Sequence, residues 1–221
     1  MILVFIGPPG GGKGTIAQML SRKGWVHFSM GQALRDHVKN GGKFAKKVSG
    51  ILSSGQLVPD AIAFAVLKDS VLHMHGKNIV FDGFPRNLDQ TKSARKVLRA
   101  LKQDFDGFVF IDVPEKIILQ RLKLRRQCEK CGKIYGSHIL PKKSGVCNAD
   151  GGKLVSRADD HPSVIRKRFH VYHTLTAPVL DWATLNYPVF RVDGSPSPNA
   201  VFKQVGRIIS FIRAASRKNK E

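Results

Sequence analysis

The sequence is short of acidic residues and of cysteine, and it has no long hydrophobic run. Its unbroken apolar runs are far too short to cross a bilayer, so no membrane-spanning segment is predicted. The apolar N-terminus reaches a glycine loop at Gly7 with no basic stretch before it, so we expect no signal peptide. Three cysteines, two of them in a Cys-x2-Cys pair, suit a metal in a reducing compartment better than a disulfide framework, and we expect a cytoplasmic protein.

The shortage of acidic residues leaves a large positive charge. There are 16 Asp and Glu against 37 Lys and Arg, which gives a formal charge of +21 at pH 7. Such an excess attracts polyanions, including nucleotides, nucleic acid and anionic membranes. We interpret most of the lysines as a solvated surface, compatible with weak, nonspecific affinity for RNA, whereas several arginines need a separate explanation. The 221 residues suit one compact domain with insertions.

A glycine-rich stretch runs from Gly7 to Thr15, between the apolar run 2–6 and a segment with helical spacing. Strand, glycine loop and helix are the context of a phosphate-binding P-loop. The bare backbone N–H groups of the loop can surround phosphate oxygens, and the helix that begins at Lys13 adds the positive end of its dipole. We predict that the Lys13 ammonium reaches the terminal phosphates and that the Thr15 hydroxyl helps to hold a metal ion.

Strand and helix patterns alternate along the rest of the chain, which predicts a parallel, doubly wound sheet. Strands are predicted at 2–6, 25–28, 77–82, 108–113 and 187–192. Helices are predicted from Lys13, from a capping Ser29, and over 42–54, 60–74, 88–102, 114–126, 162–185 and 199–216. Asp82 ends a buried-type strand near the P-loop, where an acid that organises the metal belongs.

A second insertion, rich in Gly, Lys and Cys, contains Cys128-x2-Cys131 and Cys147-x2-Asp150. Two such pairs that face each other have the geometry of a zinc ribbon. Asp150 lies at the matching spacing and is the predicted fourth ligand; His138 is its rival. Four ligands leave no open position, so this zinc would be structural and would supply folding free energy to a short insertion. The alternative is three ordinary reduced cysteines on a loop.

Taken in order, the motifs resemble the adenylate kinases, in particular the form with a long, zinc-binding lid. The resemblance rests on Gly7 to Thr15, Gly31-x2-Leu34-Arg35, Gln56-Leu57-Val58, Asp82-Gly83-Phe84-Pro85-Arg86 with Gln90, Arg121-x3-Arg125, the Cys3Asp set, Arg157-x-Asp159-Asp160 and Arg168. It implies an α/β fold with a P-loop core of five parallel strands flanked by helices, made of residues 1–28, 60–126 and 159–221. It also implies a helical insertion, 29–59, that binds the nucleoside monophosphate, and a zinc-bearing lid, 127–158.

The reaction that the resemblance implies is ATP + AMP ⇌ 2 ADP, with Mg²⁺ accompanying ATP, in a monomer without a specific nucleic-acid partner. The positions that would hold ATP are Gly10, Gly11, Gly12, Lys13, Gly14, Thr15, Arg121, Arg125, Ile134, Tyr135 and Pro196. The positions that would hold AMP are Met30, Arg35, Gln56, Leu57, Val58, Gly83, Phe84, Pro85, Arg86, Gln90, Arg157 and Arg168. The residues that would offset the negative charge of the phosphates during transfer are Lys13, Arg86, Arg125, Arg157 and Arg168. Thr15 and Asp82 would hold magnesium, partly through water, and Asp159 and Asp160 would tether arginines.

The family pattern is broken at two positions, Met30 and Gln32, where many members have threonine and aspartate. Met30 offers only apolar contact, so loss of one hydrogen bond could loosen base selectivity by ~1–2 kcal/mol. Gln90 favours adenine, yet a UMP/CMP-type kinase remains the nearest alternative. An inactive, basic zinc-ribbon protein that binds RNA is the alternative from another class. It is disfavoured because the P-loop is intact and the ribbon lacks an interleaved aromatic platform.

Overall fold

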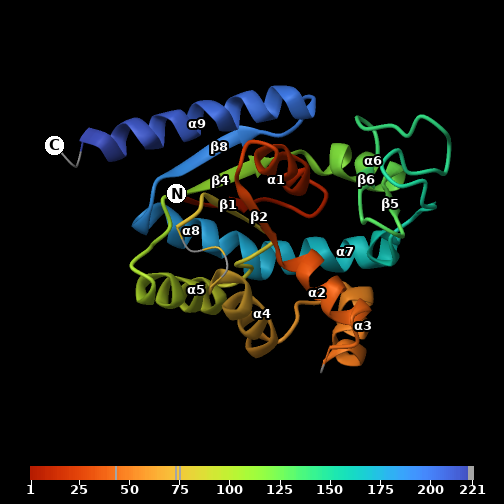
Figure 1. Cartoon of the computed structure of the whole chain (residues 1–221), viewed down its shortest axis with the longest axis horizontal. Coiled ribbons are helices and arrows are strands. Elements are labelled where there is room, and N and C mark those ends of the chain that lie inside the picture. Colours follow the sequence, from red (N-terminus) through yellow and green to blue (C-terminus); the bar gives the residue numbers. More distant parts are fainter. Residues whose placement is uncertain (43, 73, 75, 219–221) are drawn as a thin grey trace.

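The computed structural model describes residues 1–42, 44–72, 74 and 76–218, and it is organised around one sheet of five parallel strands (Figure 1). The prediction of a parallel, helix-flanked sheet is confirmed. In spatial order the strands are β2 (Val26–Ser29), β3 (Ile79–Asp82), β1 (Ile2–Ile6), β4 (Gly107–Asp112) and β8 (Val189–Asp193).

Alternate residues of β1 face opposite sides of the sheet, as the two-residue period of a strand requires. Ile2, Val4 and Ile6 join one buried cluster, whereas Leu3 and Phe5 join the other. The first cluster is covered by α5 and α8 and the second by α1 and α9, so the sheet lies between two helical layers (Figure 1). These helices are α1 (Lys13–Ser21), α5 (Leu88–Ala100), α8 (Ala177–Asn186) and α9 (Pro198–Lys218).

The register of the sheet brings the P-loop and Asp82 to the same edge. Phe5 of β1 pairs with Asp82 of β3, and Ile6 pairs with Phe110 of β4. From β1 the chain passes to β2 and then β3, which lie on one side of β1 in the sheet. It then crosses to β4 and β8, which lie on the other side. The direction in which strands are added therefore reverses at β1. Open α/β sheets bind ligands at such a switch point, beyond the carboxyl ends of the strands.

The first insertion contains α2 (Met30–Lys39) and α3 (Ala45–Ser54) and leads into α4 (Asp60–Leu72). Ser29 occupies the predicted capping position of α2, but its side chain makes no capping hydrogen bond. Gly55 ends α3 with φ +76°, a left-handed conformation that favours glycine. The predicted helices 42–54 and 60–74 extend onto residues 43 and 73, which lie outside the described residues.

The second insertion forms a small antiparallel sheet at one end of the molecule (Figure 1). Its strands are β5 (Arg126–Cys128), β6 (Ile134–Tyr135) and β7 (Leu154–Val155), and its buried cluster holds Cys128, Tyr135, Cys147 and Leu154. The preceding α6 (Glu115–Leu124) ends before Arg125, whose backbone is extended. The predicted helix through residue 126 was therefore too long, because the chain already turns into β5 at this point.

The predicted helix 162–185 is divided into α7 (Pro162–Val171), a π-helical turn (Tyr172–Thr176) and α8. In the π turn, Ala177 N–H donates to the carbonyl of Tyr172, five residues earlier. Pro178 explains the interruption, because it lacks an N–H and its ring would clash with the carbonyl four residues before it in a regular helix. Among the described helices, none combines the length and the apolar character needed to span a membrane.

Candidate active site

A cavity of about 560 Å³ opens at the carboxyl edge of the sheet, between the core and the two insertions. All seven cations that the sequence singled out line it: Lys13, Arg35, Arg86, Arg121, Arg125, Arg157 and Arg168. Its lining also includes the predicted positions Gly10, Gly11, Gly12, Gly14, Thr15, Gln56, Leu57, Asp82, Gly83, Pro85, Ile134, Tyr135 and Pro196. Four predicted substrate contacts are not in its lining: Met30, Val58, Phe84 and Gln90.

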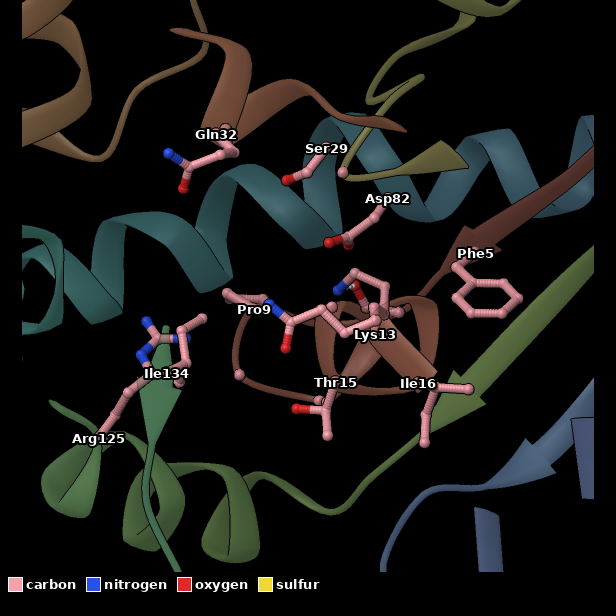
Figure 2. A pocket seen from close by; sticks show the side chains of 18 of the residues that line it. Phe5, Pro9, Lys13, Thr15, Ile16, Ser29, Gln32, Asp82, Arg125 and Ile134 are labelled. Carbon is pink, nitrogen blue, oxygen red and sulfur yellow. Dashed lines mark hydrogen bonds between the residues drawn. The ribbon is translucent and has the colours of Figure 1, made fainter. Parts of the chain in front are cut away.

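The P-loop forms the floor of this cavity. A Cβ at Gly10, where φ is +83°, would stand 2.7 Å from a side-chain carbon of Ile118, so the loop needs glycine here. The Lys13 ammonium donates to the carbonyls of Gly7 (2.6 Å) and Pro8 (2.8 Å). Figure 2 shows the Lys13 side chain in the space between the loop and Asp82. The ammonium is thus held at the cavity wall, next to the loop that carries the bare amides.

The electrostatic environment of Lys13 is strongly positive. Burial of the ammonium, together with the smaller effects of the Arg86, Arg168 and Arg125 charges, lowers its pKa to about 8 against the opposing charge of Asp82. An anion that entered the cavity would reverse this effect and favour the charged ammonium. The site is therefore complementary to a polyanion.

Asp82 lies beside the P-loop with its carboxylate 3.2 Å from His27 Nε2. Burial alone would raise its pKa, but the hydrogen bond from His27 and the charges of Lys13 and Arg86 outweigh burial and lower the pKa. One carboxylate oxygen stands 3.0 Å from where a Cβ of Gly14 would be, so a side chain there would crowd the carboxylate. An ionised carboxylate next to the loop suits the organisation of a divalent cation.

Two carboxylates from a 3-10 turn, Ala158–Asp160, gather three arginines. Arg157 makes two hydrogen bonds to Asp159, at 2.8 and 2.7 Å, and Arg168 bonds to the carbonyl of Asp159 at 3.0 Å. Arg125 donates two hydrogen bonds to the Asp160 carboxylate, one from Nε at 2.6 Å and one from Nη2. Burial, followed by the neighbouring arginine charges, lowers the pKa of Arg168 to about 10 despite Asp159. Because the three guanidinium groups outnumber the two carboxylates, this cluster keeps a net positive charge at the cavity.

Arg35 and Arg86 stand on the side of the cavity nearer the first insertion. Arg86 Nε donates to the carbonyl of Gly83 at 2.7 Å, and Arg35 Nη2 donates to the Gln32 side chain at 3.1 Å. The buried Nε of Arg35 has no hydrogen-bond partner among the described residues. Burial, together with the charge of Arg157, lowers the pKa of Arg35 to about 10. A partly buried guanidinium with an unpaired donor is suited to bind an anion.

Arg121 lies at the opposite end of the cavity, near the loop before α9. Its guanidinium donates to the carbonyls of Gly194 (2.9 Å) and Ser195 (2.8 Å). Ile134 lines the same cavity from the second insertion (Figure 2). Tyr135 is only 2% exposed, and its hydroxyl accepts from the Asn148 amide at 2.7 Å. Tyr135 therefore serves mainly the core of the insertion.

Gln90, the predicted reader of the acceptor base, has both ends of its amide engaged. Its oxygen accepts from Arg86 N–H at 2.8 Å, and its nitrogen donates to Asp60 at 2.7 Å. It lines a separate, smaller cavity of about 210 Å³ with Asp60 and Phe64. Met30 is 4% exposed and belongs to the hydrophobic core. Neither residue faces the main cavity, so base recognition through them would require the amide of Gln90 to exchange partners.

The candidate metal centre lies in the second insertion. The ligand atoms of Cys128, Cys131, Cys147 and Asp150 all lie within 4.8 Å of one another. Cys128 Sγ is 3.3 Å from Asp150, and the Sγ atoms of Cys131 and Cys147 are 3.6 Å apart. A tetrahedron of ligands at the zinc–sulfur distance has edges of about 3.8 Å, so these donors fit zinc. His138 is not part of this group and lines the main cavity.

Comparison with known proteins identifies the family. A family model described as adenylate kinase matches residues 5–186. The chain belongs to the adenylate kinase family. Curated adenylate kinases from Fervidobacterium nodosum, Methanothrix thermoacetophila and Archaeoglobus fulgidus are 35%, 38% and 34% identical to it. The matches cover 95%, 95% and 97% of this chain and 97%, 99% and 100% of those relatives.

Membership of the adenylate kinase family makes this chain a phosphotransferase enzyme. The comparisons favour neither the UMP/CMP kinase nor the RNA-binding alternative. The cavity lining includes residues that the sequence interpretation did not assign to the site, among them His27 and Thr176. The position of His27 near the end of a strand was an available signal, and Pro178 was a signal that the helix around Thr176 is irregular.

Proposed function

We propose that this chain catalyses ATP + AMP ⇌ 2 ADP in the cavity above the P-loop. The observation that carries the proposal is the convergence of seven cations on a glycine-rich amide cradle. Two polyanions repel each other strongly, and phosphoryl transfer needs positioning and charge cancellation more than covalent chemistry from the protein. The acceptor is already a phosphate oxygen, so no general base is required.

On the donor side, the amides of Gly10 to Thr15 would hold the ATP phosphates, and Lys13 would accompany the transferred group. Adenylate kinases use Mg²⁺ with ATP, and the ion would be held by Thr15 and Asp82, partly through water. When bound, magnesium would supply positive charge that offsets the charge of the phosphates. The lowered pKa of Asp82 supports this role, because the carboxylate stays ionised beside the loop.

On the acceptor side, Arg35 and Arg86 would grip the phosphate of AMP. The unpaired Nε of Arg35 and the burial of Arg86 support this assignment. Arg125, Arg157 and Arg168 would close on the transferring group from the lid side, held in position by Asp159 and Asp160. Guanidinium forks suit this work because they bind phosphate with two parallel hydrogen bonds.

Residues 29–59 and 127–158 would be the mobile parts, one binding AMP and the other acting as the lid. The adenylate kinase lid is a known example of closure that excludes water and completes a site. A structural zinc bound by Cys128, Cys131, Cys147 and Asp150 would stabilise the lid. The close grouping of the four donors supports zinc, since thiolates are ligands it prefers.

Turnover with a panel of acceptors tests the proposed reaction. Purified protein with MgATP should give the highest kcat/KM with AMP, and lower values with CMP, UMP and GMP. The preference is expected because the family is that of the adenylate kinases and Gln90 suits adenine. A clear preference for UMP or CMP would support the pyrimidine alternative, and no turnover with any acceptor would reject the proposal.

Binding of ATP should be accompanied by proton uptake near pH 8. Lys13 has a pKa of about 8 in the free protein, so about half of the molecules lack this proton at that pH. Bound phosphate favours the charged ammonium and raises the pKa, so uptake should approach ~0.5 proton per ATP at pH 8 and fall toward zero at pH 6. Calorimetric titration in two buffers with different ionisation enthalpies measures this number. The same uptake in a Lys13→Met variant would contradict the assignment.

A further inference from the structure

The backbone carbonyl of Arg86 is held by a side chain that comes from a distant part of the chain. Thr176 Oγ1 donates to Arg86 O at 2.9 Å, across a sequence separation of 90 residues. Thr176 is 8% exposed and lines the main cavity. The hydrogen bond joins a buried hydroxyl to a partly buried carbonyl, and breaking it would cost the carbonyl this partner.

The amide of Arg86 is fixed from the other side. Gln90 accepts from Arg86 N–H at 2.8 Å, and Gln90 is held in turn by Asp60 at 2.7 Å. The Arg86 guanidinium donates to Gly83 O at 2.7 Å. Both backbone polar groups of Arg86 are therefore hydrogen-bonded: its N–H to Gln90 of α5 and its carbonyl to Thr176.

The π turn explains how Thr176 reaches this position. Val171 and Thr176 are five residues apart and would point about 140° apart on a regular α-helix. Both line the same cavity, because the extra residue of the π turn changes the phase of the helix between them. Turns of this kind occur frequently at functional sites. The turn also links Thr176 to α7, which carries Arg168.

We propose that Thr176 is a positioning residue for Arg86. Its hydroxyl fixes the backbone carbonyl of Arg86 and with it the Cα that carries the guanidinium, so the guanidinium meets the acceptor phosphate at one place. The inference rests on the proposed function, in which Arg86 binds that phosphate. A misplacement of about 1 Å in such a site can reduce catalysis by as much as 10²-fold.

The variant Thr176→Val removes the hydroxyl and keeps the shape of the side chain. We expect KM for AMP to rise about 10-fold and kcat to fall, while KM for ATP stays unchanged. Thr176→Ser keeps the hydroxyl and should restore KM for AMP to near the wild-type value. Thr174→Val is a matched control, because the Thr174 hydroxyl in the same turn is exposed and bonds within its own helix to His170 O at 2.9 Å.

The outcomes separate the inference from the proposed function. If the wild-type protein does not convert ATP and AMP to ADP, the proposed function fails. If the wild type is active and Thr176→Val has the same KM for AMP, the inference is overturned. Equal changes in both KM values, or equal effects of Thr174→Val, would show a merely structural role and would also overturn it. Circular dichroism confirms that each variant is folded before kinetics are compared.

Discussion

Replacing Lys13 with methionine is expected to lower kcat by about 10³-fold, since a single donor in a preorganised oxyanion site is worth that much. The effect is large because Lys13 lies on the P-loop and lines the cavity together with six arginines. Methionine keeps the length and most of the volume of the side chain but removes its charge. Initial rates of ADP formation at saturating MgATP and AMP measure the loss.

The same substitution should leave the fold almost unchanged. The pKa of Lys13 is lowered to about 8, below its usual 10.5, so burial of the charge opposes folding below pH 8. That cost is relieved as the pH rises from about 8 to 10.5, where the folded protein has lost this proton and the unfolded chain still binds it. At pH 7 methionine removes the cost but also removes the hydrogen bonds to Gly7 and Pro8, so Tm should change little.

A matched control is Lys92→Met on the exposed face of α5, which should alter neither kcat nor Tm. A fall in Tm for Lys13→Met large enough to unfold the protein at the assay temperature would contradict a catalytic role. Activity within a few-fold of the wild type would contradict it too.

Removing the proposed zinc from the second insertion, the proposed lid, is expected to abolish most of the activity and to unfold that insertion alone. The lid has a buried cluster of only four residues, and two of them, Cys128 and Cys147, are proposed ligands. So small a core cannot offset the entropy of ordering the segment, and structural zinc contributes roughly 10–16 kcal/mol in small zinc peptides. After treatment with a strong chelator, hydrogen exchange should accelerate in residues 126–158 and stay slow in β1, β3 and β4.

Elemental analysis should give one zinc per chain before chelation. Asp150→Ala should lose the metal, and His138→Ala should retain it, because His138 lies outside the ligand group. Protein purified without chelators that contains no metal would refute the zinc assignment. Retention of zinc in Asp150→Ala together with its loss in His138→Ala would move the fourth ligand to the rival residue.

The elements that were predicted well depend on contiguous patterns. The apolar run before Gly7, the glycine loop and the helix from Lys13 form one continuous segment, and its structure follows from local spacing. The candidate metal ligands were found in the same way, because each pair lies within one short turn. Asp82 could be placed at the edge of the sheet because parallel strands end together.

The elements that were predicted poorly depend on neighbours distant in the sequence. The helix through residues 162–185 shows a continuous helical pattern, in which Pro178 signals an irregularity, but the position of the π turn is known only from the structure. The reading of a base by Gln90 stays a prediction, and its hydrogen bond to Asp60, 30 residues earlier in the chain, could not be foreseen from local spacing. His27 could not be connected with Asp82, 55 residues later, before the strand register was known.

The sequence by itself determined the P-loop, the parallel sheet and the cysteine pairs, because periodicity and spacing act within a few residues, and its resemblance to the adenylate kinases singled out the seven cations. Only the tertiary structure decided that those cations surround one cavity, that Arg125 pairs with Asp160, and that Thr176 fixes the carbonyl of Arg86. The physical reason is the range of the interactions. Side-chain geometry at the site is set by packing between segments that the chain separates by tens of residues, and no local pattern encodes it.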